Sequence, residues 1–178
     1  MFHERQRWAL CGVHAINNLL QEHRYDKSDF DAVCQQLAPE SWIINPHRSF
    51  LGIGNYDVNV LMVLLEQQLG YRVKWKDSRN KVDRKELMEY YGNGRSTSFG
   101  ILVNLPSASL VARYITKGRH WLTLLWQQDT ETWINLDSNL DEPQVIGNMD
   151  ECANLLNEWR SKQQQCHLIL VRKDTDVG

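Results

Sequence analysis

A cysteine near the start of the chain stands at the predicted beginning of a helix. Apolar side chains follow Cys11 at helical spacing, at Val13, Ile16, Leu19 and Leu20, and this stripe predicts a helix that begins near Cys11. The free N–H groups and the positive dipole end of a first helical turn favour a thiolate over a thiol. The position therefore suits a nucleophile, although a buried structural thiol is the commoner role of a single cysteine.

Two residues near this cysteine in the sequence are also suited to nucleophilic catalysis by a thiol. Gln6 has an amide that can donate hydrogen bonds to a developing oxyanion. Gly12 has no side chain, so we expect a substrate backbone to approach the thiol there. These residues alone leave open whether Cys11 is a nucleophile or a core residue, and the decision depends on partners elsewhere in the chain.

A thiol nucleophile needs a base, and the chain has six histidines. His14 lies on the same predicted helix as Cys11 and leaves little room for a substrate between them, so we expect a structural role. His120 differs because it opens an apolar strand that begins Trp121-Leu122-Thr123. An edge-strand histidine in solvent is the alternative interpretation of His120.

The strand that follows His120 supplies a candidate third residue. If residues 127–130 form a hairpin loop, the pairing places His120 opposite Asp137, with Cβ atoms about 4.5–5.5 Å apart. Asp137 would then orient the imidazole. Asn135 lies diagonally on the same face, so it is the second candidate for this role. A slip of one residue in this register would turn Asp137 to the other face of the sheet.

The remaining periodicity predicts an α+β fold with the N-terminal helix packed on an antiparallel sheet. Ser28 is the expected N-cap of the second helix, with Asp31 completing a capping box. Loops are expected at residues 41–55 and 92–96. Helices are predicted at residues 11–20, 28–38, 57–70, 83–91 and 149–162, and strands at residues 71–75, 99–105, 120–126, 133–137 and 166–171.

Length and composition predict a single domain that covers residues 1–178. A chain of 178 residues with 42% hydrophobic and 24% charged residues is ordinary for one soluble globular domain. The net charge of −2 gives no reason to expect nucleic acid as a partner. No apolar run approaches the ~18 residues of a membrane helix, so no integral membrane segment is expected.

The spacing of the cysteines and the polar N-terminus indicate that the protein occupies a reducing compartment. The four cysteines, at positions 11, 34, 152 and 166, are widely spaced and form no Cys-x-x-Cys pair, so we predict neither a metal site nor a disulfide framework. The start of the chain has no secretory signal core. We therefore expect free thiols in a reducing compartment, the cytoplasm, with the nucleus also open.

The candidate catalytic residues lie in three blocks that together closely resemble the Josephin family of cysteine deubiquitinases. The opening block runs from Phe2 to Leu20, the histidine block is Arg119-His120-Trp121, and the third block runs from Trp133 to Ser138. Residues 45–48 and 52–60 resemble the short Josephin proteins, which consist of little more than the domain. The likeness covers nearly the whole chain.

The resemblance implies a papain-like α+β fold and a role for each matched residue. Cys11 would be the nucleophile, His120 the general base and acid, and Gln6 the oxyanion donor. The orienting position falls on Asp137, where the family's polyglutamine-bearing ataxin member has asparagine. The implied reaction is hydrolysis of isopeptide bonds at the C-terminal glycine of ubiquitin. The implied partners are ubiquitin, ubiquitinated proteins or polyubiquitin chains, and no cofactor is implied.

Substrate contacts and rival functions stay open at this point. Trp8, Trp121, Val58 and Asn59 are candidate contacts to ubiquitin, together with Gly12, and each competes with a plain core or surface role. A protease for a related ubiquitin-like modifier, or an acyltransferase, would use the same triad. A catalytically weak or idle ubiquitin-binding module is the alternative from another class of protein, and it would bind ubiquitin without turnover.

Overall fold

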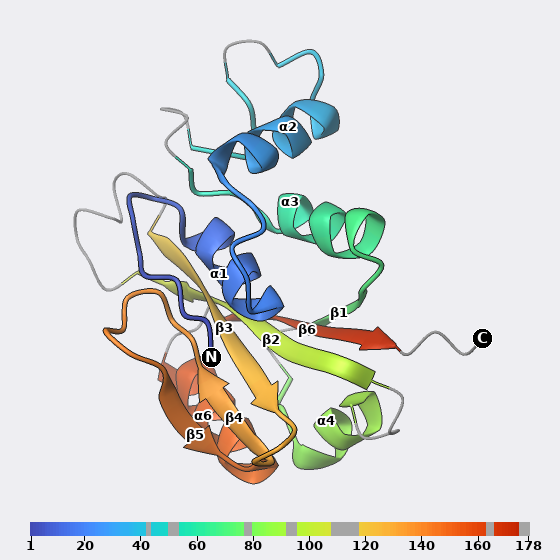
Figure 1. The fold of residues 1–178 in the computed structure, drawn as a ribbon, viewed down its shortest axis with the longest axis vertical. Coiled ribbons are helices and arrows are strands. Elements are labelled where there is room, and N and C mark those ends of the chain that lie inside the picture. Colours follow the sequence, from blue (N-terminus) through green and yellow to red (C-terminus); the bar gives the residue numbers. More distant parts are fainter. Residues whose placement is uncertain are drawn as a thin grey trace.

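The computed structural model describes residues 1–41, 44–49, 54–76, 80–91, 96–107, 118–162 and 166–174. The two predicted loops lie partly outside these residues. Within the described part of the chain, six strands form one sheet whose paired neighbours are all antiparallel (Figure 1). Its spatial order is β1 (Arg72–Lys76), β6 (His167–Asp174), β2 (Ser96–Pro106), β3 (Arg119–Gln127), β4 (Thr132–Asn135) and β5 (Gln144–Gly147).

Alternation along the central strands separates two hydrophobic cores. In β2, Leu102 belongs to one core, whereas Ile101 and Val103 belong to the other. In β3, Trp121 joins the core of Leu102, and Leu122 joins the opposite one. Because successive strand residues point to opposite faces, both sides of the sheet are covered. The mixed helix and antiparallel sheet confirms the predicted α+β class.

The helices divide between these two faces. The first core is built with α1 (Cys11–Leu20), α2 (Lys27–Leu37), α3 (Val58–Met62) and the π-helical turn η1 (Val63–Gln68), and the second with α4 (Arg84–Tyr91) and α6 (Met149–Lys162). Figure 1 shows α2 at one end of the molecule and α4 and α6 at the other. None of the helices in the described ranges is long and apolar enough to span a membrane.

The cap of α2 differs from the prediction. Asp26, and not Ser28, is the N-cap, and its carboxylate accepts from the backbone N–H groups of Ser28 at 2.6 Å and Asp29 at 3.3 Å. Asp29 closes the capping box by accepting from the N–H of Asp26 at 2.8 Å. The helix therefore begins earlier than predicted, because a carboxylate is available two residues before the serine. Asp31 is left to pair with Arg48 at 2.9 Å.

The third helix agrees with its prediction in extent. Asp57 caps it by accepting from the backbone N–H groups of Asn59 at 2.9 Å and Val60 at 3.4 Å. The wider turn of η1 continues α3, and the chain then leaves the helix at Gly70, whose φ of 67° is left-handed. Sequence periodicity predicts the helix but not the change from α to π geometry.

The hairpin between β3 and β4 is shifted by two residues from the predicted register. Trp126 pairs with Trp133, and Leu124 pairs with Asn135, so the loop consists of residues 128–131. The two tryptophan rings pack edge to face, with centroids 5.6 Å apart. This cross-strand aromatic pair gives the observed register a contact that the predicted register lacks.

Candidate active site

Cys11 is the first residue of α1 and is buried, with 3% of its surface exposed. No side chain caps this end of the helix, so N–H groups of the first turn are left to stabilise an anionic group of a substrate there. Two buried bonds fix α1 against the sheet. Thr123 Oγ1 of β3 donates to Ala15 O at 2.6 Å, and Asn18 Nδ2 donates to Leu136 O at 2.9 Å.

His120 stands between this thiol and a carboxylate. Its Nε2 lies 2.6 Å from Asp137 Oδ1, and the Cys11 thiol is close enough to its ring to affect the pKa of His120. Burial alone would lower the pKa of His120, but the hydrogen bonds and charges of Asp137 and Cys11 outweigh it and raise this pKa to about 10. The three predicted residues therefore meet, and the arrangement can hold an imidazolium between two acceptors.

Asp137 reaches His120 from a turn and not from the sheet. Strand β4 ends at Asn135, so the predicted direct opposition of His120 and Asp137 is wrong although their contact is present. The Asp137 carboxylate also accepts from the N–H of Asn139 at 2.9 Å, and the N–H of Leu140 donates to Asp137 O at 2.9 Å. These bonds form an Asx-type turn that aims the carboxylate.

Asn135, the second candidate for orienting His120, supports Asp137 instead. Asn135 Oδ1 accepts from the N–H of Asp137 at 3.0 Å. Asn135 is buried and pairs with Leu124 of β3 in the sheet. Sequence reasoning missed two residues of the same cluster. Asn139 Nδ2 lies 3.1 Å from His120 Nε2, and His3 Nε2 lies 3.0 Å from Asp137 O. The turn signal Asp-Ser-Asn is the sequence feature that could have pointed to Asn139.

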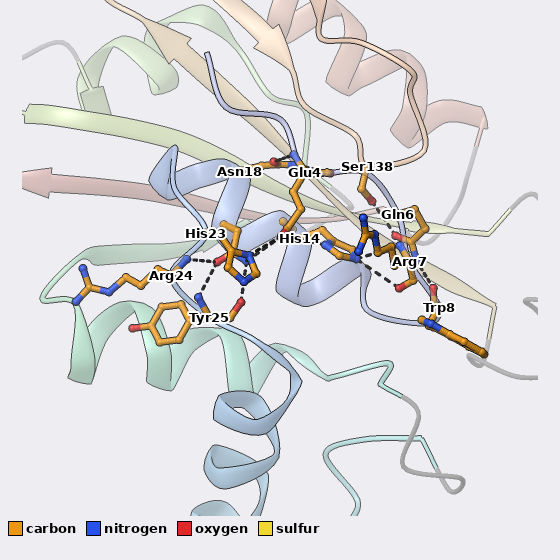
Figure 2. A network of polar contacts seen from close by, with 12 residues as sticks. Glu4, Gln6, Arg7, Trp8, His14, Asn18, His23, Arg24, Tyr25 and Ser138 are labelled. Atoms are coloured by element: carbon orange, nitrogen blue, oxygen red, sulfur yellow. Dashed lines mark hydrogen bonds and ion pairs between the residues drawn. The ribbon is translucent and has the colours of Figure 1, made fainter.

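Gln6 lies beside the same turn (Figure 2). Its backbone N–H donates to Ser138 O at 2.7 Å, and the Ser138 hydroxyl donates to Gln6 Oε1 at 2.8 Å. The Gln6 amide nitrogen donates to Trp8 O. The Trp8 carbonyl can only accept, so it fixes which side of the amide is the donor.

Trp8 is the most exposed large apolar side chain beside the site, at 86%. Its φ of 54° is left-handed, which is uncommon for a residue with a bulky side chain. The residue that follows it, Ala9, accepts from the N–H of Asn55 at 2.8 Å. The loop before Cys11 therefore holds a tryptophan ring in solvent three residues before this cysteine.

Gly12 faces the core, and its role in the approach of a substrate stays a prediction. Gly12 is buried, and a side chain there would meet Leu61 Cδ1 at 3.6 Å, Trp121 Cδ1 at 3.7 Å and Phe30 Cε1 at 3.8 Å. The missing side chain thus faces the core, because α1 turns this position toward β3 and α3. Gly54 is the glycine that permits a close backbone approach, to the carbonyl of Ala9.

A cleft of about 260 Å³ lies between the loop before α3 and the sheet. Trp121, which follows His120 in β3, forms one wall, and its Nε1 donates to Tyr56 O at 3.1 Å. Val58 also lines the cleft, together with the charged side chains of Arg48 and Arg119. Asn59 lies on the exposed first turn of α3, where its amide donates to Asp57 at 3.2 Å.

The other three cysteines lie away from His120 and Asp137 in sequence and have raised pKa values. Cys34, Cys152 and Cys166 are buried free thiols, and burial raises their pKa values, to about 12 for Cys34 and about 11 for Cys166. These thiols stay protonated and inert at neutral pH. Among the residues that the structure describes, no group of three or more His, Cys, Asp or Glu side chains is arranged to hold a metal ion.

Comparison with known proteins identifies the relatives of this chain. The family model described as Josephin matches residues 6–171. Josephin-2 of Homo sapiens is 41% identical over 173 residues, which cover 96% of this chain and 85% of that protein. A Josephin-like protein of Drosophila melanogaster is 36% identical over 174 residues, 96% of this chain and 73% of that protein. On this match over nearly its whole length, the chain belongs to the Josephin family of cysteine proteases.

Proposed function

We propose that the protein, as one catalytic domain, hydrolyses isopeptide bonds at the C-terminal glycine of ubiquitin. The observation that carries the proposal is the contact of His120 with both Cys11 and Asp137, in a chain of the Josephin family. A nucleophile, a base and an orienting acceptor in mutual reach are the parts that thiol acyl transfer needs. The reduced thiolate also requires a reducing compartment, which we infer to be the cytoplasm.

The first half of the reaction forms a thioester. The Cys11 thiolate attacks the carbonyl carbon of the terminal glycine, and the carbonyl oxygen becomes an oxyanion. The N–H of Cys11, at the start of α1, and the amide of Gln6 stabilise this charge. One N–H of this amide donates to Trp8 O in the structure, so the oxyanion would take the second N–H of the same nitrogen.

Departure of the lysine amine completes the first half, and hydrolysis of the thioester, the second half, regenerates the enzyme. His120 gives its proton to the lysine amine, so the C–N bond breaks and the thioester remains. The neutral imidazole then takes a proton from water, whose oxygen attacks the thioester carbonyl and releases Cys11. Asp137, at 2.6 Å from Nε2, holds the ring in one orientation through both steps and stabilises its charged form.

The burial of the nucleophile supports a slender substrate. Only 3% of Cys11 is exposed, so a diglycine tail without side chains is better suited to reach it than a branched sequence. The cleft beside Trp121 and Val58 would receive the residues that precede this tail. The exposed ring of Trp8 offers an apolar contact to the body of ubiquitin.

A covalent probe tests the proposal. Ubiquitin with a vinyl electrophile in place of its terminal carboxylate should label the wild-type protein once, at Cys11. Cys11→Ala should remove both the labelling and the hydrolysis of ubiquitin chains while leaving the melting temperature near that of the wild type. Cys34→Ala is the matched control, because the raised pKa of Cys34 leaves that thiol unreactive and labelling should persist.

The same experiment separates the rival functions. Labelling by a related ubiquitin-like modifier, but not by ubiquitin, would make the protein a protease for that modifier. Ubiquitin binding without labelling, unchanged in Cys11→Ala, would indicate an idle binding module. Turnover by a well-folded Cys11→Ala protein would exclude Cys11 as the nucleophile.

A further inference from the structure

The segment that leads into Cys11, residues 2–8, is here called the N-terminal arm. It runs beside α1 and is held there by side chains of that helix (Figure 2). His14 forms the central contact. Its Nδ1 lies 2.9 Å from Glu4 Oε2, and its Nε2 accepts from the backbone N–H of Arg7 at 3.1 Å. One imidazole therefore joins two points of the arm to the helix of the nucleophile.

The two partners fix the tautomer of His14. Nε2 lies 3.1 Å from the backbone N of Arg7 and 3.4 Å from the carbonyl O of the same residue. The shorter contact is with an N–H that can only donate, so it favours a lone pair on Nε2 and the proton of the neutral ring on Nδ1. Nδ1–H then donates to the Glu4 carboxylate. His14 is 5% exposed, so a polar group that lost its partner here would stay away from water.

Glu4 is suited to receive this proton donor. Asn17 Nδ2 donates to Glu4 Oε2 at 2.9 Å, and His23 Nδ1 lies 2.6 Å from Glu4 Oε1. Burial opposes ionisation of Glu4, but the hydrogen bonds from His14, Asn17 and His23 outweigh it and hold the pKa of Glu4 below its usual range. The arm is therefore anchored at Glu4 by a carboxylate and at Arg7 by an imidazole acceptor.

Gln6 lies between these two anchors in the sequence. On the side away from α1, it is bound to the turn that contains Asp137. Its backbone N–H donates to Ser138 O at 2.7 Å. The position of the Gln6 amide thus depends on the arm being held on one side by α1 and on the other by the turn. The same two elements supply Cys11 and Asp137.

We infer that His14 is a positioning residue of the reaction: by accepting from Arg7 N–H it keeps the Gln6 amide within reach of the carbonyl that Cys11 attacks. This inference rests on the oxyanion role that the proposed function gives to Gln6. His14 and Cys11 both belong to α1. The bond from His14 to the arm therefore fixes the arm relative to Cys11. Because the oxyanion exists only after attack, the effect belongs in kcat and not in KM.

Two amide substitutions separate the bonds of His14. In His14→Asn the amide nitrogen can stand where Nδ1 stands and keep the bond to Glu4, but no acceptor reaches Arg7 N–H. In His14→Gln the amide oxygen can stand where Nε2 stands and restore that acceptor. We expect His14→Asn to lower kcat by about 10-fold to 100-fold, as for one buried hydrogen bond lost, and His14→Gln to recover most of it.

His23→Ala is the matched control. His23 shares the Glu4 carboxylate, but 63% of its side chain is exposed, and it is therefore expected to leave kcat unchanged. Melting curves of all variants check folding. Should His14→Asn not fold, the imidazole nitrogen shifts of the wild type decide instead, since a proton on Nε2 of neutral His14 would overturn the inference.

A double-mutant cycle with Gln6→Ala completes the test. If His14 acts through Gln6, His14→Asn should cost almost nothing in a Gln6→Ala background, so the two losses are not additive. Additive losses, or a loss confined to KM, would overturn the positioning role while leaving the proposed function intact. An unchanged kcat in Gln6→Ala would contradict the oxyanion assignment itself, and the two failures are thereby distinguished.

Discussion

His120 Nε2 and Asp137 Oδ1 lie 2.6 Å apart although the ladder between β3 and β4 ends at Asn135. The contact depends on the turn after β4, which aims the carboxylate back at the first residues of β3. Asn135 and Asn139 hold that turn from both sides, through bonds of 3.0 Å and 2.9 Å. The geometry of the base is therefore set by a few side chain to backbone bonds.

Substitutions at Asp137 should separate orientation from charge. We expect Asp137→Ala to lower kcat by about 10²-fold or more, because the imidazole loses both its acceptor and the charge that favours imidazolium. Asp137→Asn keeps an acceptor and should retain more activity than Asp137→Ala. The measurement is kcat/KM of both variants on one fluorogenic ubiquitin substrate.

Asn135→Ala tests how much the turn that carries Asp137 depends on the Asn135 side chain. It removes the acceptor for Asp137 N–H, so we expect about 1 kcal/mol less stability and a smaller loss of kcat than in Asp137→Ala. Melting curves and kcat/KM measure the two effects. A folded Asn135→Ala protein without activity, beside an active Asp137→Ala protein, would make Asn135 the orienting residue.

Alkaline pH should weaken the fold through His120. The pKa of this group is raised from 6.5 to about 10 in the folded protein, so its contribution to stability is complete below pH 6.5 and is lost as the pH rises through about 10. Asp137→Asn removes a charge that raises this pKa, and should reduce the loss. Urea unfolding of both proteins at the two ends of this window measures it, and equal losses in both would contradict the prediction.

The fold could be predicted wherever periodicity was strong. The stripe of α1 and the apolar run of β2 come from residues that pack on one face, and the structure has both elements. Strand β5 was missed, because Pro143 and Gly147 indicate a loop and its residues are only partly buried or exposed. The register of β4 depends on the packing of Trp126 against Trp133, which a loop-length argument does not contain.

The site could be predicted only in its residue types. The sequence predicts Cys11, His120 and Asp137, and the structure brings them together. Their neighbours act through hydrogen bonds that the sequence does not reveal: Ser138 bonds the Gln6 side chain, and His14 bonds the backbone N–H of Arg7. Such bonds leave no spacing pattern, because the partners are adjacent only in the fold.

Gly54→Ala should damage the loop beside the nucleophile. Gly54 has a φ of 122°, and a Cβ there would stand 2.1 Å from Ala9 O, so the loop must move away from the residues before Cys11. We expect a loss of about 2 kcal/mol or more in stability, together with lower kcat. Thermal melting and kcat measure these effects.

Gly70→Ala is the control for backbone strain alone. Its φ of 67° is also positive, but nothing lies within 4 Å of a Cβ there. The expected cost is therefore only about 1 kcal/mol, with kcat unchanged. Equal melting temperatures for the two variants would show that the contact with Ala9 does not constrain the loop.

Ser138 should matter to catalysis through Gln6. The Ser138 hydroxyl donates to Gln6 Oε1 at 2.8 Å, and this bond keeps the amide nitrogen on the side of the loop that leads to Cys11. Without the hydroxyl the amide is held only by its bond to Trp8 O, so it is less firmly positioned to donate to the oxyanion. We therefore expect Ser138→Ala to lower kcat about tenfold, as for one hydrogen bond lost, and to leave KM nearly unchanged.

Gln6→Ala sets the upper limit for that effect. Removing the donor itself should lower kcat by about 10²–10³, and Ser138→Ala should then cause little further loss in the same chain. Ser161→Ala is the matched control, since its hydroxyl donates to Glu158 O at 2.8 Å on an exposed part of α6. A further tenfold loss in the double variant would mean that Ser138 acts on Asp137 or His120 and not on the amide of Gln6.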